Sequence, residues 1–338
     1  MQHEITKHGA LLDARGNVRE PGWARSLLLD YCRADVKASG LKIKEWDYYI
    51  VMNDAQGIAL TVADNGYMGL VSASVLDFRQ PWECTKTVVK PFPMGKYKMP
   101  ETSERGDTLF GDNRVQAAFF KRDERRALFC RFERFLNDDA LDLSLSLYEP
   151  KMDSMVIATP FEKQGAFYYN QKINCMRAAG KVMLGDREFT FEPHNSFATL
   201  DWGRGVWTYD NTWYWGNGNG IVNGKIFGFN IGYGFGDMSA ASENMLFYDG
   251  VAHKLSKVSF NIPQGGYMEP WTFTSDDGRF EMDFTPILDR AAHLNALILS
   301  SEQHQVFGRF TGRAVLDDGT VLTLKDLLGF AEKVHNRY

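Results

Sequence analysis

The sequence predicts an all-β protein of antiparallel strands, arranged either as two related β-barrels or as one very large curved sheet. Aromatic residues make up 14% of the 338 residues, and 31 residues are Gly, a combination typical of antiparallel sheet with many tight turns. The segment 140–147 has Leu at every odd position, which is the period-2 pattern of a strand with one wet face. Asx-Gly pairs recur between apolar runs, as in two-residue hairpin turns.

A first series of strands is expected in the N-terminal half. Its members are 45–52, 58–62, 67–75, 113–120, 127–135 and 140–147, interrupted by a Pro-rich connection at 91–107. Asn65-Gly66 opens one of the hairpins. Before the first of these strands, a short helix is expected within 26–37.

A second series begins near Gly165. Its turns are predicted at Gly185-Asp186, Asn223-Gly224, Asp249-Gly250, Asp277-Gly278 and Asp318-Gly319, as in an up-and-down meander. We therefore expect two β domains, 1–160 and 161–338, with the Trp-rich segment described below in the second. The C-terminal segment 325–338 has apolar residues at near-helical spacing, but a final strand fits nearly as well.

Composition excludes several classes of function. The net charge is −5 and the chain has no long basic run, so a nucleic-acid partner is not expected. The N-terminal residues lack the order of a secretory signal, and no apolar run reaches membrane-spanning length, so we expect a cytoplasmic protein without an integral membrane span. The four Cys and seven His form no zinc-binding spacing within one element, and no strand-to-helix context makes the glycines of 216–236 a nucleotide loop. No metal and no cofactor is therefore predicted.

The segment 200–215 concentrates four of the eight tryptophans around one acid and one arginine. These are Trp202, Trp207, Trp213, Trp215, Asp201 and Arg204. Such a cluster belongs in a concave site, or in a core where Asp201 and Arg204 satisfy each other as a structural ion pair. Both alternatives stay open, and the ion pair is favoured for these two residues taken alone.

In an aromatic-lined barrel, Asp201 has two possible roles. With Arg204 close, it orients the guanidinium to hold a polar head; with Arg204 turned away, it protonates an alkene or assists a cyclisation. The Trp rings would supply π faces for a cationic intermediate. Further candidates are Glu243 for catalysis and Tyr169, Lys172, Asn230 and Asn244 for ligand binding, each of which fits a structural role about as well.

Motifs along the whole chain resemble one bacterial family. Besides 201–207 they are Trp23, 44–49, 65–69, 169–172, 228–232, Glu243-Asn244, 269–271, 307–312 and 326–332. From about Leu11 to Tyr338 the sequence is similar to the uncharacterised family called domain of unknown function 2804.

More distantly, 180–185, 201–203 and 213–215 resemble the AttH and carotenoid 1,2-hydratase (hydroxyneurosporene synthase) group. That group is built from two lipocalin-like barrels and includes polyene hydratases, with relatives among tocopherol cyclases and fungal pericyclases. The resemblance implies two tandem lipocalin-like, calycin-type antiparallel barrels with few short helices. Trp202-Gly203 follows the acid directly and the group's histidine after that acid is absent, so hydratase activity itself is not carried over.

We therefore expect a small apolar or amphipathic ligand, such as a lipid, polyene or terpenoid, in a barrel lumen. The chemistry would be an acid-promoted hydration, isomerisation or cyclisation without metal or nucleotide. One alternative is a non-catalytic carrier of the same ligand. A second is a carbohydrate-binding or carbohydrate-active protein that uses Trp platforms with Asp201, Glu243, Glu269 and Glu281.

Overall fold

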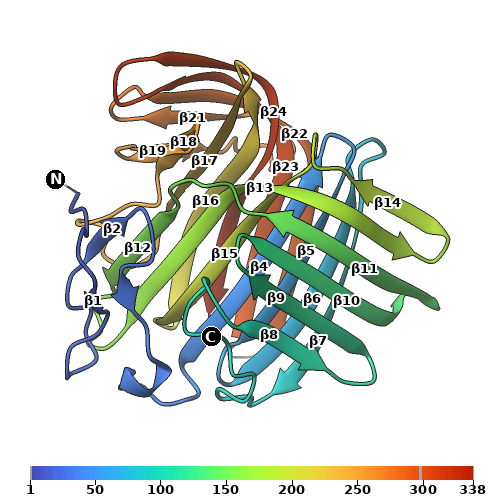
Figure 1. The fold of residues 1–338 in the computed structure, drawn as a ribbon. Coiled ribbons are helices and arrows are strands. Elements are labelled where there is room, and N and C mark those ends of the chain that lie inside the picture. Colours follow the sequence, from blue (N-terminus) through green and yellow to red (C-terminus); the bar gives the residue numbers. More distant parts are fainter. Residues whose placement is uncertain (1, 297–298, 338) are drawn as a thin grey trace.

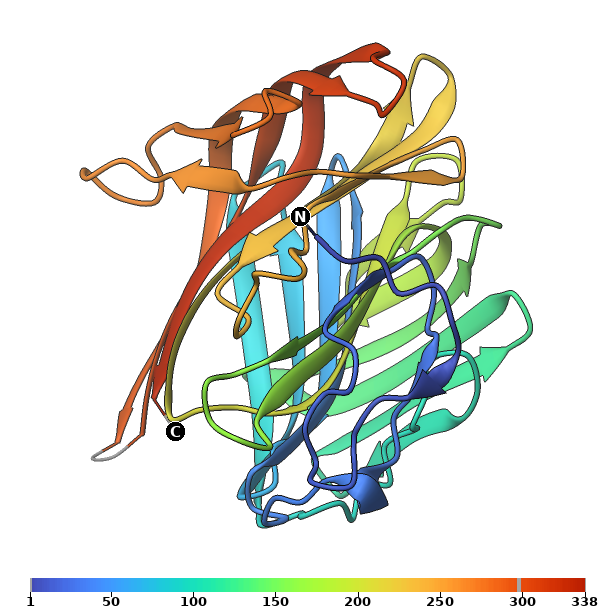
Figure 2. The same ribbon diagram turned by 90° about the vertical axis from the view of Figure 1, so that its left-hand side faces the viewer.

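Two large antiparallel sheets make up most of the computed structural model, which describes residues 2–296 and 299–337. Both sheets curl (Figure 1), and the view in Figure 2 shows the long strands of the second sheet beside those of the first. The architecture confirms the predicted all-β fold of two tandem lipocalin-like barrels. In the described residues the only helix is a 3-10 turn, Arg33–Asp35, so no described helix is long enough or apolar enough to cross a bilayer.

The first sheet has 13 strands. Its main path runs through β7 (Trp82–Pro91), β6 (Met68–Asp77), β5 (Gln56–Asp64), β4 (Ile43–Asn53), β15 (Phe197–Val206), β13 (Phe167–Leu184), β11 (Asp139–Tyr148), β10 (Arg125–Leu136), β9 (Val115–Arg122) and β8 (Asp107–Gly111). Beside this path, β12 (Met155–Pro160) pairs with β13 and β2 (Gly22–Ala24), and β14 (Arg187–Phe191) pairs with β13. A separate parallel pair joins β1 (Gly9–Ala10) and β3 (Leu29–Asp30).

The second sheet has nine strands. Their order is β19 (Val251–Lys254), β18 (Met245–Tyr248), β17 (Lys225–Tyr233), β16 (Asp210–Val222), β24 (Val321–Arg337), β23 (Leu299–Val315), β22 (Phe280–Ala296), β21 (Trp271–Ser275) and β20 (Val258–Asn261). The C-terminal segment is therefore a strand, the second of the two structures that its pattern allowed.

Each predicted turn lies between paired strands, but Asp277-Gly278 and Asp318-Gly319 stand in connections longer than two residues. Asn223 and Gly224 have φ of 50° and 76°, and Asp249 and Gly250 have φ of 52° and 90°, as a two-residue turn with two left-handed positions requires. Strand β11 buries its leucines and exposes or half-buries the residues between them, as its alternation predicted. These features follow from local chemistry, so the sequence alone sufficed to predict them.

The chain passes from the first sheet to the second between β15 and β16. Strand β15, which carries Asp201 to Arg204, pairs with β4 and β13 and so belongs to the first sheet. The domain boundary at residue 160 stays a prediction. A mixed aromatic and aliphatic core lies between the sheets, with members from β4, β13, β16, β23 and β24 such as Tyr48, Tyr168, Trp215, Phe307 and Phe330.

Candidate functional site

The side chains of β13 and β15 alternate between the two faces of the first sheet, and one face places polar residues between the sheets. Successive side chains of a strand face opposite sides, so Tyr168, Asn170 and Lys172 of β13 share one face. In the antiparallel register Lys172 lies opposite Asp201 of β15. Both strands therefore turn polar groups toward β16 and β17 of the second sheet.

A buried charge cluster forms where the sheets meet. Lys172 Nζ lies 2.8 Å from Asp201 Oδ1 and 3.9 Å from Glu243 Oε2, and its side chain is 2% exposed. The ammonium also lies 4.4 Å from the centre of the Trp215 ring, within the range of a cation–π interaction. Two carboxylates and one ammonium are thus taken out of water together, an arrangement that requires compensation by pairing and hydrogen bonds.

Glu243 is the innermost member of this charge cluster. Its Oε1 accepts a hydrogen bond from Tyr168 Oη at 2.8 Å, and its Oε2 accepts one from Asn230 Nδ2 at 3.3 Å. Trp215 Nε1 in turn donates to Asn230 Oδ1 at 2.7 Å. Burial raises the pKa of the Glu243 carboxyl, and the Lys172 ammonium opposes that rise. The structure therefore brings together Lys172, Asp201, Trp215, Asn230 and Glu243, five residues singled out in the sequence.

Asp201 is the more accessible carboxylate of the charge cluster. Asn170 Nδ2 donates to Asp201 Oδ1 at 2.6 Å, the same oxygen that binds Lys172. The Asp201 side chain is 12% exposed, whereas that of Glu243 is fully buried. Within the described chain, Asn170 Oδ1 and Trp207 Nε1 are buried without a hydrogen-bond partner. Unpaired buried polar atoms are uncommon in folded proteins, and one of these two belongs to the amide that binds Asp201.

Glu332 of β24 is a site residue that the sequence analysis missed as an individual candidate. Trp213 Nε1 donates to its Oε1 at 3.0 Å, and Gln305 Nε2 donates to its Oε2 at 2.9 Å. Burial raises the pKa of Glu332 to about 7. The signal that could have found it is one acid alternating with Leu328 and Phe330 on the apolar face of a strand.

Aromatic rings cover the charge cluster. Trp46 stacks on Tyr168 with ring centres 6.0 Å apart, and Trp207 contacts both rings edge-on. Gly203 explains the Trp-Gly pair that follows Asp201, because a Cβ there would lie 2.0 Å from Trp46 Cζ2. Only glycine lets the Trp46 ring lie flat on β15.

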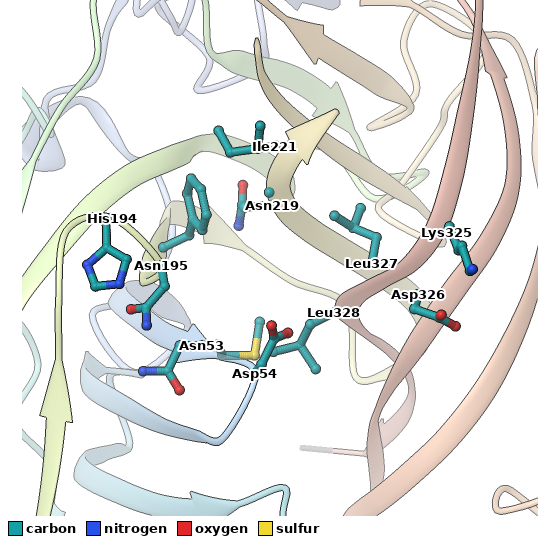
Figure 3. A pocket seen from close by; sticks show the side chains of 13 residues that line it. Asn53, Asp54, His194, Asn195, Asn219, Ile221, Lys325, Asp326, Leu327 and Leu328 are labelled. Atoms are coloured by element: carbon teal, nitrogen blue, oxygen red, sulfur yellow. The ribbon is translucent and has the colours of Figure 1, made fainter. Parts of the chain in front are cut away.

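An asparagine network leads from the charge cluster to a pocket at one edge of the sheets. Asn219 Nδ2 donates to Asn217 Oδ1 at 3.3 Å, and Asn217 Nδ2 donates to Asn230 Oδ1 at 3.1 Å. Asn219 lines a pocket of about 280 Å³ (Figure 3) between the 194–195 loop and the 325–328 segment of β24. Its other lining residues are Met52, Asn53, Asp54, Phe197, Gly220 and Ile221.

The expected ion pair between Asp201 and Arg204 is wrong. Residues three apart in a strand face opposite sides, so Arg204 points into the core of the first sheet. There its guanidinium binds Asp47 Oδ1 at 3.1 Å and the carbonyl oxygens of Trp46, Pro100 and Gly203. Arg204 is fully buried, and protein oxygens accept from all five of its N–H donors.

Three other sequence candidates lie apart from the charge cluster. Tyr169 and Trp202 pack edge-to-face in the core of the first sheet, and Tyr169 Oη donates to the Leu29 carbonyl at 2.7 Å. Trp202 Nε1 is buried there without a partner in the described chain. Asn244 accepts from Gly232 N at 2.8 Å and donates to the Ser256 carbonyl at 2.8 Å, contacts that join β17 to the segment after β19.

Solved structures share this fold at low sequence identity. CghA in complex with Sch210972 is 10% identical, with a TM-score of 0.51 over 96% of this chain and 97% of that chain. Kievitone hydratase from Nectria haematococca is 8% identical, with a TM-score of 0.52 over 98% of both chains. A protein assigned as AttH from Nitrosomonas europaea is 11% identical, with a TM-score of 0.52 over 90% of this chain and 96% of that one.

At such identities the likeness establishes the fold. No curated protein matched the sequence. A family model, in contrast, matches residues 2–338, which is almost the whole chain and includes every residue of the charge cluster. The chain therefore belongs to the family described as Domain of unknown function (DUF2804).

Proposed function

We propose that this protein binds a small, largely apolar molecule between its two sheets and promotes its hydration, isomerisation or cyclisation by acid catalysis, without metal or nucleotide. The observation that carries the proposal is the charge cluster of Lys172, Asp201 and Glu243, buried beside the Asn170 amide, whose Oδ1 has no partner in the described chain. Asn170 Oδ1 is unpaired although the Asn170 amide donates to Asp201, so the charge cluster has a free acceptor for a further partner.

In the proposed reaction, two carboxyl groups have different roles. Glu332, with a pKa of about 7, is the proton donor to a carbon–carbon double bond. The faces of Trp213 and Trp215 stabilise the resulting carbocation. Attack by water with loss of one of its protons gives hydration, and loss of a neighbouring proton gives isomerisation. Attack by a second double bond moves the positive charge to a new carbon, and loss of a proton beside that carbon completes the cyclisation. The Asp201 carboxylate accepts the released proton, and exchange with solvent restores both groups.

The site of this proposal keeps Asp201, Glu243, Lys172, Asn230, Trp207, Trp213 and Trp215 from the sequence analysis and adds Glu332. It leaves out Arg204, Tyr169, Trp202 and Asn244, because their contacts lie elsewhere. The fold shared with a hydratase supports the reaction class, and it is the site chemistry that selects the residues.

Mass spectrometry of protein purified from its own host tests the proposal. We expect native spectra of the wild type to contain a bound apolar molecule, and organic extraction to release it. Asp201→Asn should retain the unreacted molecule, which wild-type protein should then convert in solution. Tyr169→Phe is the matched control, because Tyr169 lies on the opposite face of β13 and should leave binding and conversion unchanged.

A carrier is the second candidate, favoured by the deep burial of Lys172 and Glu243, whose side chains are 2% and 0% exposed. A carrier would bind the same molecule in the wild type and in Asp201→Asn and convert it in neither. If no apolar molecule accompanies any of these proteins, both candidates are wrong and the charge cluster has a structural role.

A further inference from the structure

A second group of chemically active side chains lies on the long hairpin of β22 and β23. It consists of His293, Glu302 and His304, whose nearest ligand atoms all lie within 4.8 Å of one another. His293 and Glu302 are directly opposed in the antiparallel register, and His304 follows Glu302 on the same face. Val306, next on that face, belongs to the core of the second sheet, whereas Gln305 faces the first sheet. The group is therefore separated from the Asp201 site by the thickness of β23.

His304 is held in one orientation by two contacts. Its Nδ1 lies 2.7 Å from Asp289 Oδ2, and its ring stacks on Tyr267 with centres 3.8 Å apart and planes at 13°. Because an ionised carboxylate only accepts hydrogen bonds, this contact places a proton on Nδ1. In the neutral ring the Nε2 lone pair is then free, and Nε2 lies 3.8 Å from Glu302 Oε1. A carboxylate that orients a histidine in this way is the usual outer partner of a metal-binding imidazole.

The charges around His304 favour a cation. Asp289 and Glu302 supply two carboxylates, and Asp289 Oδ1 is buried without a hydrogen-bond partner in the described chain. A buried carboxylate oxygen without a partner is costly, and a positive charge nearby would lower that cost. Lys333, the register partner of His304 on β24, carries a positive charge near this group. Its ammonium, however, lies over the Tyr214 ring.

We propose that His293, Glu302 and His304 form a binding site for a divalent transition metal of the Zn²⁺ class, with Asp289 as the residue that positions His304. Two imidazoles and one carboxylate are a recognised three-ligand set for such ions. In tetrahedral coordination the ligand atoms lie about 3.3 Å apart. The exposed side chains of His293 and Glu302 can close the remaining gap by rotation, while His304 stays fixed.

Beside this metal site lies a pocket of about 320 Å³, lined by Glu302 together with Tyr267, Lys333, His335, Thr212 and Tyr214. A three-ligand ion keeps a fourth position for water or a small ligand, and this pocket provides the space. The sequence predicts no metal because its Cys and His residues show no ligand spacing within one element. The three ligands come from two strands paired through a hairpin, so their proximity depends on register.

Zn²⁺ titration of the untagged full-length protein by isothermal calorimetry, with Co²⁺ absorption as an optical readout of coordination, tests the metal site. We expect saturable binding of one ion per chain. His304→Ala and His293→Ala should each lower the affinity by more than about tenfold, since each removes one of three ligands. Asp289→Asn should weaken binding about 10-fold or more while leaving the ligand set intact.

His194→Ala is the matched control, because His194 lines the distant pocket of Figure 3 and should leave the affinity unchanged. Circular dichroism of each variant separates loss of a ligand from loss of the fold. The proposal is overturned if no saturable binding occurs, if binding survives both histidine variants in folded protein, or if His194→Ala weakens it equally. Binding of Mg²⁺ as tight as that of Zn²⁺ would also overturn it, because imidazole ligands disfavour Mg²⁺.

Discussion

Arg204 and Asp201 lie on opposite faces of β15, and their surroundings differ in how completely they satisfy the charge. Protein oxygens accept from every N–H donor of Arg204, which also lies over the Trp202 ring. Asp201 binds Lys172 and Asn170 through a single oxygen and keeps 12% of its side chain exposed. The first arrangement is a structural anchor, and the second has capacity for a further partner.

This difference separates two uses of buried charge in one strand. A completely coordinated guanidinium ties β15 to β4 and to the Pro100 segment, so its role is to fix the first sheet. The Asp201 carboxylate binds one ammonium and one amide through a single oxygen, so its other oxygen is available for a substrate.

Arg204→Leu should destabilise the protein by about 3–5 kcal/mol, because it leaves Asp47 as an unpaired buried carboxylate and removes the donors of three carbonyls. Asp201→Asn should cost only about 1 kcal/mol, since Lys172 keeps Glu243 as a partner. Urea denaturation of both variants measures the difference. Equal losses would contradict the contrast between the two faces.

Gly203→Ala should cost about 1–3 kcal/mol by overpacking, because the added methyl would lie 2.0 Å from Trp46 Cζ2 and the Trp46 ring would have to move off β15. Gly111→Ala is the control: its Cβ would have no heavy atom within 4 Å, and the change should be close to neutral. Thermal unfolding followed by circular dichroism compares the two. An equal effect at both glycines would mean that the Trp46 contact does not constrain the strand.

The sequence could predict strands and turns because their signals are local. The leucine alternation of β11 and the Asn223-Gly224 turn each depend on a few adjacent residues. The neighbours of β15 could not be predicted, because β4 lies about 150 residues away in the chain and only the hydrogen-bonded register shows that Gly203 meets Trp46.

The candidate site could be predicted in part. Asp201 was found because tryptophans concentrate around it, and its pairing with Arg204 was wrong because spacing was considered without the alternation of a strand. The partnership of Asp201 with Lys172 needs the register of β13 and β15, which shifts between Ile173 and Met176. Glu332 was missed because its segment fitted a helix nearly as well as a strand.

The stability of the wild type relative to Glu332→Gln should fall between about pH 4.5 and 7. Burial raises the pKa of Glu332 from 4.5 to about 7, so the folded state favours the protonated carboxyl. Its contribution is therefore fully present below the unfolded pKa and is lost as the pH rises through the folded pKa. Urea denaturation at several pH values should show the Gln variant gaining on the wild type across this range.

Glu188→Gln is the control for this titration, because Lys181 and Thr190 lower the pKa of that exposed carboxyl and the trend should be weaker and of opposite sign. A pH-independent difference between wild type and Glu332→Gln would mean that Glu332 stays ionised between the sheets. Glu332 could then not be the proton donor of the proposed reaction, and the site around Asp201 would have no proton donor.

The smallest expected effect compares two tryptophans on the Asp201 side. Trp215→Phe removes the hydrogen bond from Nε1 to Asn230 Oδ1, whereas Trp207→Phe removes an Nε1 that has no partner in the described chain. Both changes delete similar ring volume, so Trp215→Phe should cost about 0.5–1.5 kcal/mol more than Trp207→Phe. Urea denaturation of the two variants measures this difference.

A different outcome is expected if Trp207 Nε1 donates to the bound molecule. Trp207→Phe would then be the costlier change in protein that carries the molecule, and the order would reverse after extraction. Such a reversal would identify the unpaired donor as part of the binding site and would distinguish the Asp201 face from the Arg204 guanidinium, whose N–H donors are all bonded.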